Sequence, residues 1–141
     1  MTDSLRTSLV DKLIKLEQYL NEMKNEKPPT YNEYLSNRIT RYGIERLLQL
    51  IVDLALDINN IIIKYYGRPP AADYFNSFIE LVEIGVLDRE FAYQIALSTG
   101  LRNRLVHEYE KIDNSIVYES IDKTYEYYLK YMKRIAEFIE L

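Results

Sequence analysis

The sequence predicts an all-α fold, an antiparallel bundle of about four to five helices. Apolar residues recur at alternating steps of three and four through most of the chain, as they do on one face of an amphipathic helix. No stretch alternates apolar and polar residues as a half-buried strand does, and there is no internal repeat. With 141 residues, 48% of them hydrophobic, the chain has the size of one globular domain, so we expect a single domain over residues 1–141.

The first predicted helix carries one apolar stripe, formed by Leu9, Leu13, Leu16, Leu20 and Met23. This spacing is typical of a helix packed along one neighbour. The helix should end before Lys27, because Pro28 and Pro29 lack the amide donor and restrict the preceding residue.

A long second helix is expected to follow the capping box that Thr30 and Glu33 form. Its apolar residues keep a heptad pattern, and further apolar residues widen the stripe to more than one side. Such a helix must be covered on more than one side, which favours a central position and a bundle core. The stripe consists of Ile44, Leu47, Leu48, Ile51, Leu54, Ala55, Ile58, Ile61, Ile62 and Tyr65.

The other face of this helix is acidic, with Glu45, Gln49, Asp53 and Asp57 each four residues from the last. Two carboxylates one turn apart could bind a hard cation, but no neighbouring residues supply the further oxygen ligands of such a site. A solvated or ion-paired face is the alternative. The most specific version of this alternative is that Asp53 or Asp57 holds Arg102 in place from across the bundle.

Glycine and aspartate mark the ends of the shorter helices in the middle of the chain. Gly67 should end the long helix, and Gly85 the next one, which Asp73 caps and whose inner face carries Phe75, Phe78, Ile79 and Val82. Asp88 should cap a further helix with Phe91, Ile95, Ala92 and Ala96 inward. Because glycine disfavours a helix interior, we expect a kink or a restart at Gly100.

The last helix is rich in tyrosine, and two interpretations of these rings stay open. Its apolar stripe is Ile121, Tyr125, Tyr128, Met132, Ile135 and Ile139, with Tyr118, Tyr127 and Tyr131 on flanking positions. The rings could stack on nucleic-acid bases. We favour the alternative, in which the rings form core and rim, with apolar ring bodies packed inside and hydroxyls in contact with water.

The candidate site is the segment from Arg102 to Tyr109, which holds the only histidine of the chain. The guanidiniums of Arg102 and Arg104 can bind phosphate oxygens, and the imidazole of His107 can transfer a proton near neutral pH. These groups suit phosphate-ester cleavage. The alternative is that His107 caps or packs a helix and that the arginines are solvated.

The geometry of an ideal helix separates the two main groups of this segment. Arg102 and Tyr109 would share one stripe, and Asn103 would stand one turn before His107. Arg102 and His107, however, would diverge by roughly 140°. A site that uses both therefore needs local distortion or a second chain.

The arrangement of Arg102, His107 and Tyr109 resembles the R-x4-H-x-Y signature of the HEPN superfamily, specifically the HepT-type toxins that pair with a minimal nucleotidyltransferase antitoxin. Residues 41–46 (RYGIER) and 67–70 (GRPP) also resemble upstream segments of that family. The resemblance extends from about residue 38 to the C-terminus. It implies a toxin that acts as a metal-independent endoribonuclease, in which the ribose 2′-hydroxyl attacks the adjacent phosphorus and leaves a cyclic phosphate.

The same resemblance implies a role for each residue of the signature. His107 would be the general base or acid, and Arg102 would neutralise charge on the phosphoryl oxygens, with Asn103 and Arg104 in support. The antitoxin would attach adenylate to Tyr109; the alternative is that Tyr109 only packs against or hydrogen bonds His107. Members are homodimers whose two signatures face each other across a cleft, so a homodimer is expected here. No metal and no cofactor is implied.

The charge balance favours a different function. A net charge of −4 argues against a general nucleic-acid binder, so an RNase would need a local basic patch. Arg38, Arg41 and Arg46 could form such a patch with Arg102 and Arg104. The main alternative is a non-catalytic helical adaptor that presents substrate to a nucleotidyltransferase, and a purely structural bundle is a further one.

Composition also limits chemistry and location. The chain has no cysteine, which excludes disulfides and thiolate metal sites, and a single histidine makes a zinc site improbable. The N-terminus lacks the basic and apolar regions of a signal peptide, and no apolar run is long enough to cross a bilayer. We therefore expect a cytoplasmic protein.

Overall fold

The computed structural model describes residues 1–140, and these residues form α-helices, one 3-10 turn and no strand. The all-α prediction is confirmed. The elements are α1 (Asp3–Glu26), α2 (Tyr31–Ser36), α3 (Arg38–Tyr65), α4 (Tyr74–Ile84), α5 (Arg89–Ala96), α6 (Ser98–His107), the 3-10 turn η1 (Tyr109–Lys111) and α7 (Asn114–Glu140).

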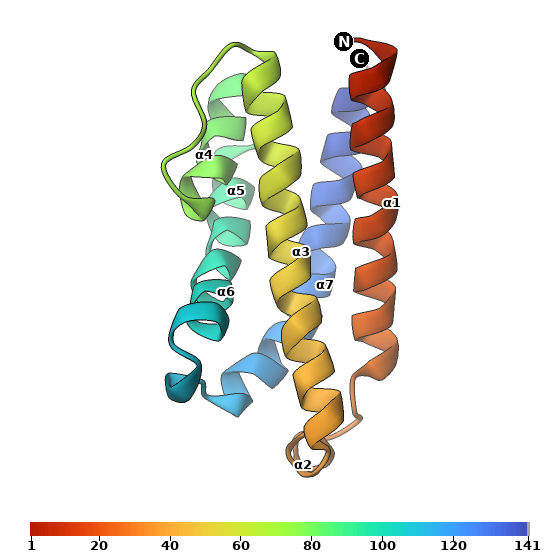
Figure 1. Cartoon of the computed structure of the whole chain (residues 1–141), viewed down its shortest axis with the longest axis vertical. Coiled ribbons are helices and arrows are strands. Elements are labelled where there is room, and N and C mark those ends of the chain that lie inside the picture. Colours follow the sequence, from red (N-terminus) through yellow and green to blue (C-terminus); the bar gives the residue numbers. More distant parts are fainter. Residues whose placement is uncertain (141) are drawn as a thin grey trace.

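The long helices α1, α3 and α7 run side by side, and the shorter α4, α5 and α6 pack on the far side of α3 (Figure 1). The start of α1 and the end of α7 lie at one end of the bundle, while α2 lies at the other end, as does the turn between α6 and α7. α3 contacts α1, α2, α4, α6 and α7, so its predicted central position is confirmed. None of the helices within residues 1–140 is long and apolar enough to span a membrane.

Most residues of the predicted stripes lie in the core, but Tyr65, at the end of the α3 stripe, is exposed. All five stripe residues of α1 are buried, as are Ile44, Leu48, Ile51, Ala55, Ile58 and Ile62 of α3. The core also holds a polar link: the Asn59 amide donates to Ser77 Oγ at 2.9 Å, and the Tyr131 hydroxyl donates to Asn59 Oδ1. This link joins α3, α4 and α7 at one level.

The tyrosines of α7 divide between core and rim. Tyr128 and Tyr131 are fully buried, and burial raises the pKa of both hydroxyls. Tyr118, Tyr125 and Tyr127 are half-buried against the core. The core-and-rim interpretation is thereby favoured over base stacking, because a buried ring has no face free for a base.

The long second helix was predicted as continuous from its cap, and this prediction is wrong at Asn37. Thr30 Oγ1 accepts from the Glu33 amide at 3.2 Å as expected, but the helix that it caps, α2, ends at Ser36. Asn37 Oδ1 then accepts from the Thr40 amide at 3.1 Å and starts α3. A short amide side chain that binds the backbone competes with helix continuation.

The predicted restart before the signature occurs, but at Leu97 rather than at Gly100, which lies inside α6. The Ser98 and Thr99 hydroxyls donate to the Ile95 and Ala96 carbonyls at 2.6 and 2.7 Å. These side-chain bonds accompany the break between α5 and α6. The breaks at Asn37 and Leu97 increase the number of helical segments, but the bundle architecture is as predicted.

The other helix ends follow the sequence signals. Gly67 and Gly85 have positive φ, of 72° and 93°, and follow α3 and α4 as predicted. Asp73 and Asp88 cap α4 and α5 through the Asn76 and Phe91 amides at 2.7 and 2.9 Å. The inner face of α4 is rotated from the prediction, since only Phe78 of the expected set is buried, together with Ser77 and Leu81.

Candidate active site

Arg102 is anchored to α3. Its Nε donates to Asp53 Oδ1 at 2.7 Å, and its side chain is only 12% exposed. The hypothesis that an acid of α3 holds this arginine is confirmed for Asp53, whereas Asp57 is exposed one turn further on. A partly buried, charge-assisted bond of this length fixes the orientation of the guanidinium plane.

Two further contacts complete the setting of Arg102. Its guanidinium carbon lies 4.3 Å from the centroid of the Tyr74 ring, in cation–π contact, and Nη1 donates to Asn103 Oδ1 at 3.2 Å. Sequence reasoning missed Tyr74, because the contact depends on how α4 packs beside α6. Burial, with the negative charge of Asp53 beside it, raises the pKa of Tyr74.

His107 is the last residue of α6 and is exposed. The Glu108 amide donates to the Arg104 carbonyl at 2.9 Å and closes the helix directly after it. Arg102 faces α3 and α4, while His107, about 140° away around the helix, faces solvent. One chain therefore places the two groups in different surroundings.

Tyr109 lies outside α6, because that helix ends at His107. The prediction that Arg102 and Tyr109 share one helical stripe is therefore wrong. Both side chains nevertheless reach α3: the Tyr109 hydroxyl donates to Glu45 Oε1 at 2.6 Å, while Arg102 binds Asp53. No hydrogen bond between Tyr109 and His107 occurs in the described part of the chain.

Glu45 is buried, with 7% of its surface exposed. Burial of the Tyr109 hydroxyl, its hydrogen bond to Glu45 and the charge of that carboxylate raise the pKa of Tyr109 to about 12. Sequence reasoning placed Glu45 on the acidic face of α3 but assigned it no partner. The sequence did contain one indication of such a partner: Glu45 lies two turns before Asp53, on the face of α3 that meets α6.

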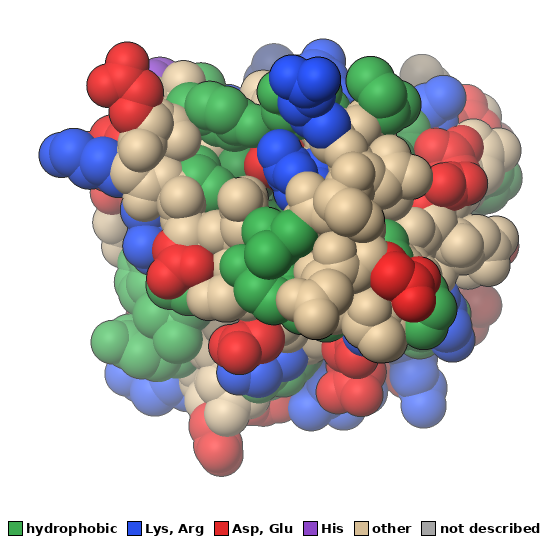
Figure 2. All heavy atoms as spheres, turned by 90° about the horizontal axis from the view of Figure 1, so that it is seen from below, with side chains coloured by type: hydrophobic (Ala, Val, Ile, Leu, Met, Phe, Trp, Pro, Cys, Tyr) green, Lys and Arg blue, Asp and Glu red, His purple; other side chains and the backbone are tan. Residues whose placement is uncertain are grey.

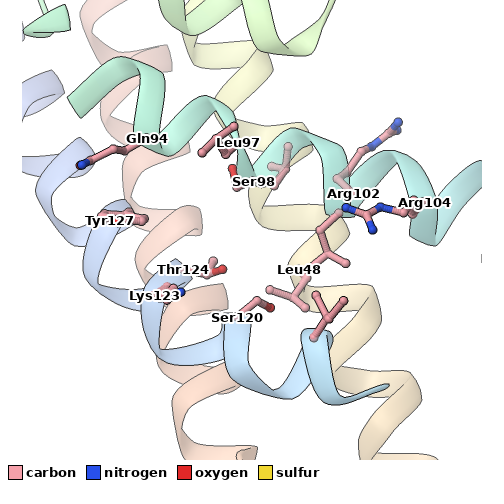
Figure 3. Close-up of a pocket in the computed structure, with 13 residues that line it drawn as sticks. Leu48, Gln94, Leu97, Ser98, Arg102, Arg104, Ser120, Lys123, Thr124 and Tyr127 are labelled. Carbon is pink, nitrogen blue, oxygen red and sulfur yellow. The ribbon is translucent and has the colours of Figure 1, made fainter. Parts of the chain in front are cut away.

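A cavity of about 300 Å³ lies between α3, α6 and α7 (Figure 3). Leu48 from α3, Ser98 and Leu101 from α6, and Thr124 from α7 line it. Arg102 and Arg104 stand at one side and Lys123 at the other, so a mainly apolar hollow has basic groups around it. His107 and Tyr109 are not among its lining residues.

The predicted basic patch is only partly available. Arg41 donates to the Leu35 carbonyl and Arg102 is paired with Asp53, whereas Arg38, Arg46 and Arg104 are exposed. Figure 2 shows basic and acidic side chains intermixed on the end of the bundle seen there. No group of three or more His, Asp or Glu side chains within residues 1–140 is placed to hold a metal ion.

Comparison with known proteins gives concordant matches. A family model described as "Ribonuclease HepT-like" matches residues 12–135. The tRNA nuclease HepT of Aphanizomenon flos-aquae is 38% identical over 122 residues, which are 86% of this chain and 83% of that protein.

Solved structures match the fold over nearly its whole length. A tri-AMPylated HEPN toxin of Shewanella oneidensis, in complex with its MNT antitoxin, superposes with a TM-score of 0.84 at 17% identity over 97% of this chain and 99% of that one. A toxin–antitoxin complex with AMP-PNP gives a TM-score of 0.83 at 16% identity, over 92% and 97% of the two chains. At these identities the matches show the fold.

Proposed function

The chain belongs to the HepT-like ribonuclease family, and we propose from this membership that it is the toxin of a toxin–antitoxin module and cleaves RNA. The resemblance inferred from the signature is thereby confirmed at the level of the family. The relative that is named a tRNA nuclease makes tRNA the first substrate to test. A cytoplasmic location fits such a substrate and is part of the proposal.

The observation that carries the proposal is the intact signature with its arginine held in place. Arg102 is fixed by Asp53 and Tyr74, and its Nη1 also donates to Asn103, which leaves Nη2 as the guanidinium nitrogen that can meet a phosphate. A preoriented cation beside a developing phosphorane lowers the barrier without reorganising in the reaction. A freely solvated arginine, the alternative given for this residue, does not fit this arrangement.

The proposed reaction is attack of a ribose 2′-hydroxyl on the adjacent phosphorus. His107 takes the hydroxyl proton or supplies a proton to the departing 5′-oxygen, and Arg102 stabilises the charge on the phosphoryl oxygens. Asn103, bonded to Arg102, and the exposed Arg104 support phosphate binding. The products are a cyclic phosphate and a 5′-hydroxyl, and no step uses a metal ion.

A homodimer is part of the proposal. Because Arg102 and His107 of one chain diverge by about 140°, a facing second copy supplies the group that a single α6 directs elsewhere. Two copies of His107 then serve as base and acid.

The proposed partner is a nucleotidyltransferase antitoxin that adenylylates Tyr109. This residue is 48% exposed, so its ring is accessible although its hydroxyl is bonded to Glu45. The mass of the Tyr109 peptide after expression with the cognate transferase tests this step. An unchanged mass would contradict it.

The test of the cleavage reaction uses a chimeric RNA. We expect the unmodified dimer to cleave a tRNA and to leave cyclic phosphate ends. We expect no cleavage at the same site when the nucleotide on its 5′ side lacks the 2′-hydroxyl. Equal cleavage of the deoxy-substituted RNA would contradict 2′-hydroxyl attack, and no cleavage of any RNA by a folded, unmodified dimer would favour the adaptor, which the net charge of −4 supports.

A further inference from the structure

The turn after His107 is joined to α3 by one polar contact of the described chain. Every residue from 106 to 111 is exposed, and half-buried Ile112 follows as an apolar contact with the core. Within residues 1–140, the Tyr109 hydroxyl is the only group of η1 that hydrogen bonds to α3, at 2.6 Å from Glu45 Oε1. The position of this turn therefore depends strongly on one bond.

Glu45 is a buried carboxylate that requires a hydrogen-bond donor. It is 7% exposed and lies inside α3 beside fully buried Ile44, so the surrounding packing restricts its side chain. No lysine, arginine or histidine of the described chain forms an ion pair with it. The Tyr109 hydroxyl is the side-chain donor that balances this buried carboxylate.

We propose that Glu45 is a positioning residue: it holds unmodified Tyr109, and with it the turn beside His107, against α3, and adenylylation of Tyr109 releases that turn. The inference rests on the proposed function and deepens it. It gives the modification a conformational effect, in addition to any obstruction of the cleft by the attached nucleotide.

The chemistry of the transfer explains the release. The phenolic oxygen of Tyr109 attacks the α-phosphorus of ATP, the bond from that phosphorus to the bridging oxygen breaks, and pyrophosphate leaves while the phenolic proton passes to solvent. The product oxygen carries a phosphodiester with one negative charge and no hydrogen to donate. It would face the Glu45 carboxylate, so an attractive contact becomes a repulsion between like charges.

Three backbone amides report on the turn. The amides of Glu108, Lys111 and Ile112 donate to the carbonyls of Arg104, Glu108 and Tyr109 at 2.9, 2.9 and 3.1 Å. If the turn leaves α3, these bonds open more often and their hydrogen exchange accelerates. Exchange at these positions can be measured without any RNA or transferase.

The first comparison uses unmodified protein. We expect Glu45→Ala and Tyr109→Phe each to raise exchange at the three amides about tenfold, as loss of a hydrogen bond to a charged group implies. Glu45→Gln should stay close to the original protein, because its amide oxygen still accepts. Tyr93→Phe is the matched control, since Tyr93 is exposed and its hydroxyl bonds to nothing in the described chain. Unchanged exchange in both Glu45→Ala and Tyr109→Phe would overturn the proposal.

The second comparison uses protein adenylylated at Tyr109. We expect the adenylylated original protein to exchange as fast as unmodified Glu45→Ala, and adenylylated Glu45→Gln to exchange more slowly, because the repulsion is gone. Adenylylated protein that keeps slow exchange would overturn the proposal and leave obstruction of the cleft as the effect of the nucleotide. If Glu45→Ala does not fold, Tyr109→Phe provides the same reference without a change in α3.

Kinetic measurements distinguish a positioning role of Glu45 from a general effect of its substitution on stability. With RNA as substrate, Glu45→Ala should lower kcat about tenfold at an unchanged KM, and Glu45→Gln should restore it. Equal losses in both variants would contradict a role through the hydrogen bond. A folded protein that cleaves no RNA, or shows no mass change at Tyr109, would contradict the proposed function, whereas unchanged exchange contradicts the role of Glu45 alone.

Discussion

At the scale of single residues, the signature arginine depends on an acid from another helix. Asp53 and Asp57 stand one turn apart on α3, but only Asp53 binds Arg102. The sequence allowed this pair to be predicted, because the four-residue spacing of the acids puts them on one face. The contact with Tyr74 could not be predicted from the sequence, because it arises from the packing of α4 against α6.

Asp53→Ala should lower kcat for RNA cleavage about 10- to 100-fold, because a guanidinium displaced by about 1 Å loses its alignment with the phosphate. The free energy of unfolding should fall by about 1–3 kcal/mol through loss of the charge-assisted bond. Single-turnover cleavage well below the unfolding temperature measures the first effect. Asp57→Ala is the matched control and should leave cleavage nearly unchanged; equal losses in both variants would contradict a specific role for Asp53.

The Tyr109 hydroxyl should make alkaline stability depend on pH. Its pKa is raised from 10.0 to about 12, so the folded state holds the proton more tightly than the unfolded state does. The stabilisation is therefore present below pH 10 and is lost as the pH rises through 12. Urea unfolding of the original protein and of Tyr109→Phe should show a stability difference that shrinks over this interval. A difference independent of pH would contradict the shifted pKa.

At the scale of elements, caps and glycines with positive φ were predictable, whereas the positions of the helix breaks were not. Thr30, Asp73 and Asp88 act locally, so the few residues around each determine the cap. The break at Leu97 instead involves hydroxyls that turn back to the carbonyls of α5, and Ser98 also lies 2.9 Å from the buried Tyr128 hydroxyl. That second contact comes from the distant α7, which spacing alone does not place.

Two glycines should respond oppositely to alanine. Gly100 lies inside α6, and a Cβ there would meet nothing within 4 Å, so Gly100→Ala should raise the free energy of unfolding by about 0.5–1 kcal/mol. Gly85 has a φ of 93°, so Gly85→Ala should lower it by about 1–2 kcal/mol. Urea unfolding of both variants is the measurement. Destabilisation by Gly100→Ala would show that α6 needs a distortion at this residue.

At the scale of the whole molecule, the sequence was sufficient for the all-α bundle and for the central place of α3. Stripe periodicity carries this information directly, as the buried residues of α1 and α3 show. The periodicity of the stripes does not determine which side chains of neighbouring helices contact each other. The bond between Tyr109 and Glu45 was therefore not predicted. The homodimer stays a prediction, and it follows from the divergence of Arg102 and His107 around one helix.

The most direct measurement of the central claim is cleavage of tRNA in EDTA by the unmodified protein and by His107→Ala, with folding and dimer state verified for both. We expect the original protein to cleave and His107→Ala to be slower by about 10²- to 10⁴-fold, as loss of a general acid–base group implies. Equal cleavage by both proteins would contradict a ribonuclease site centred on the signature.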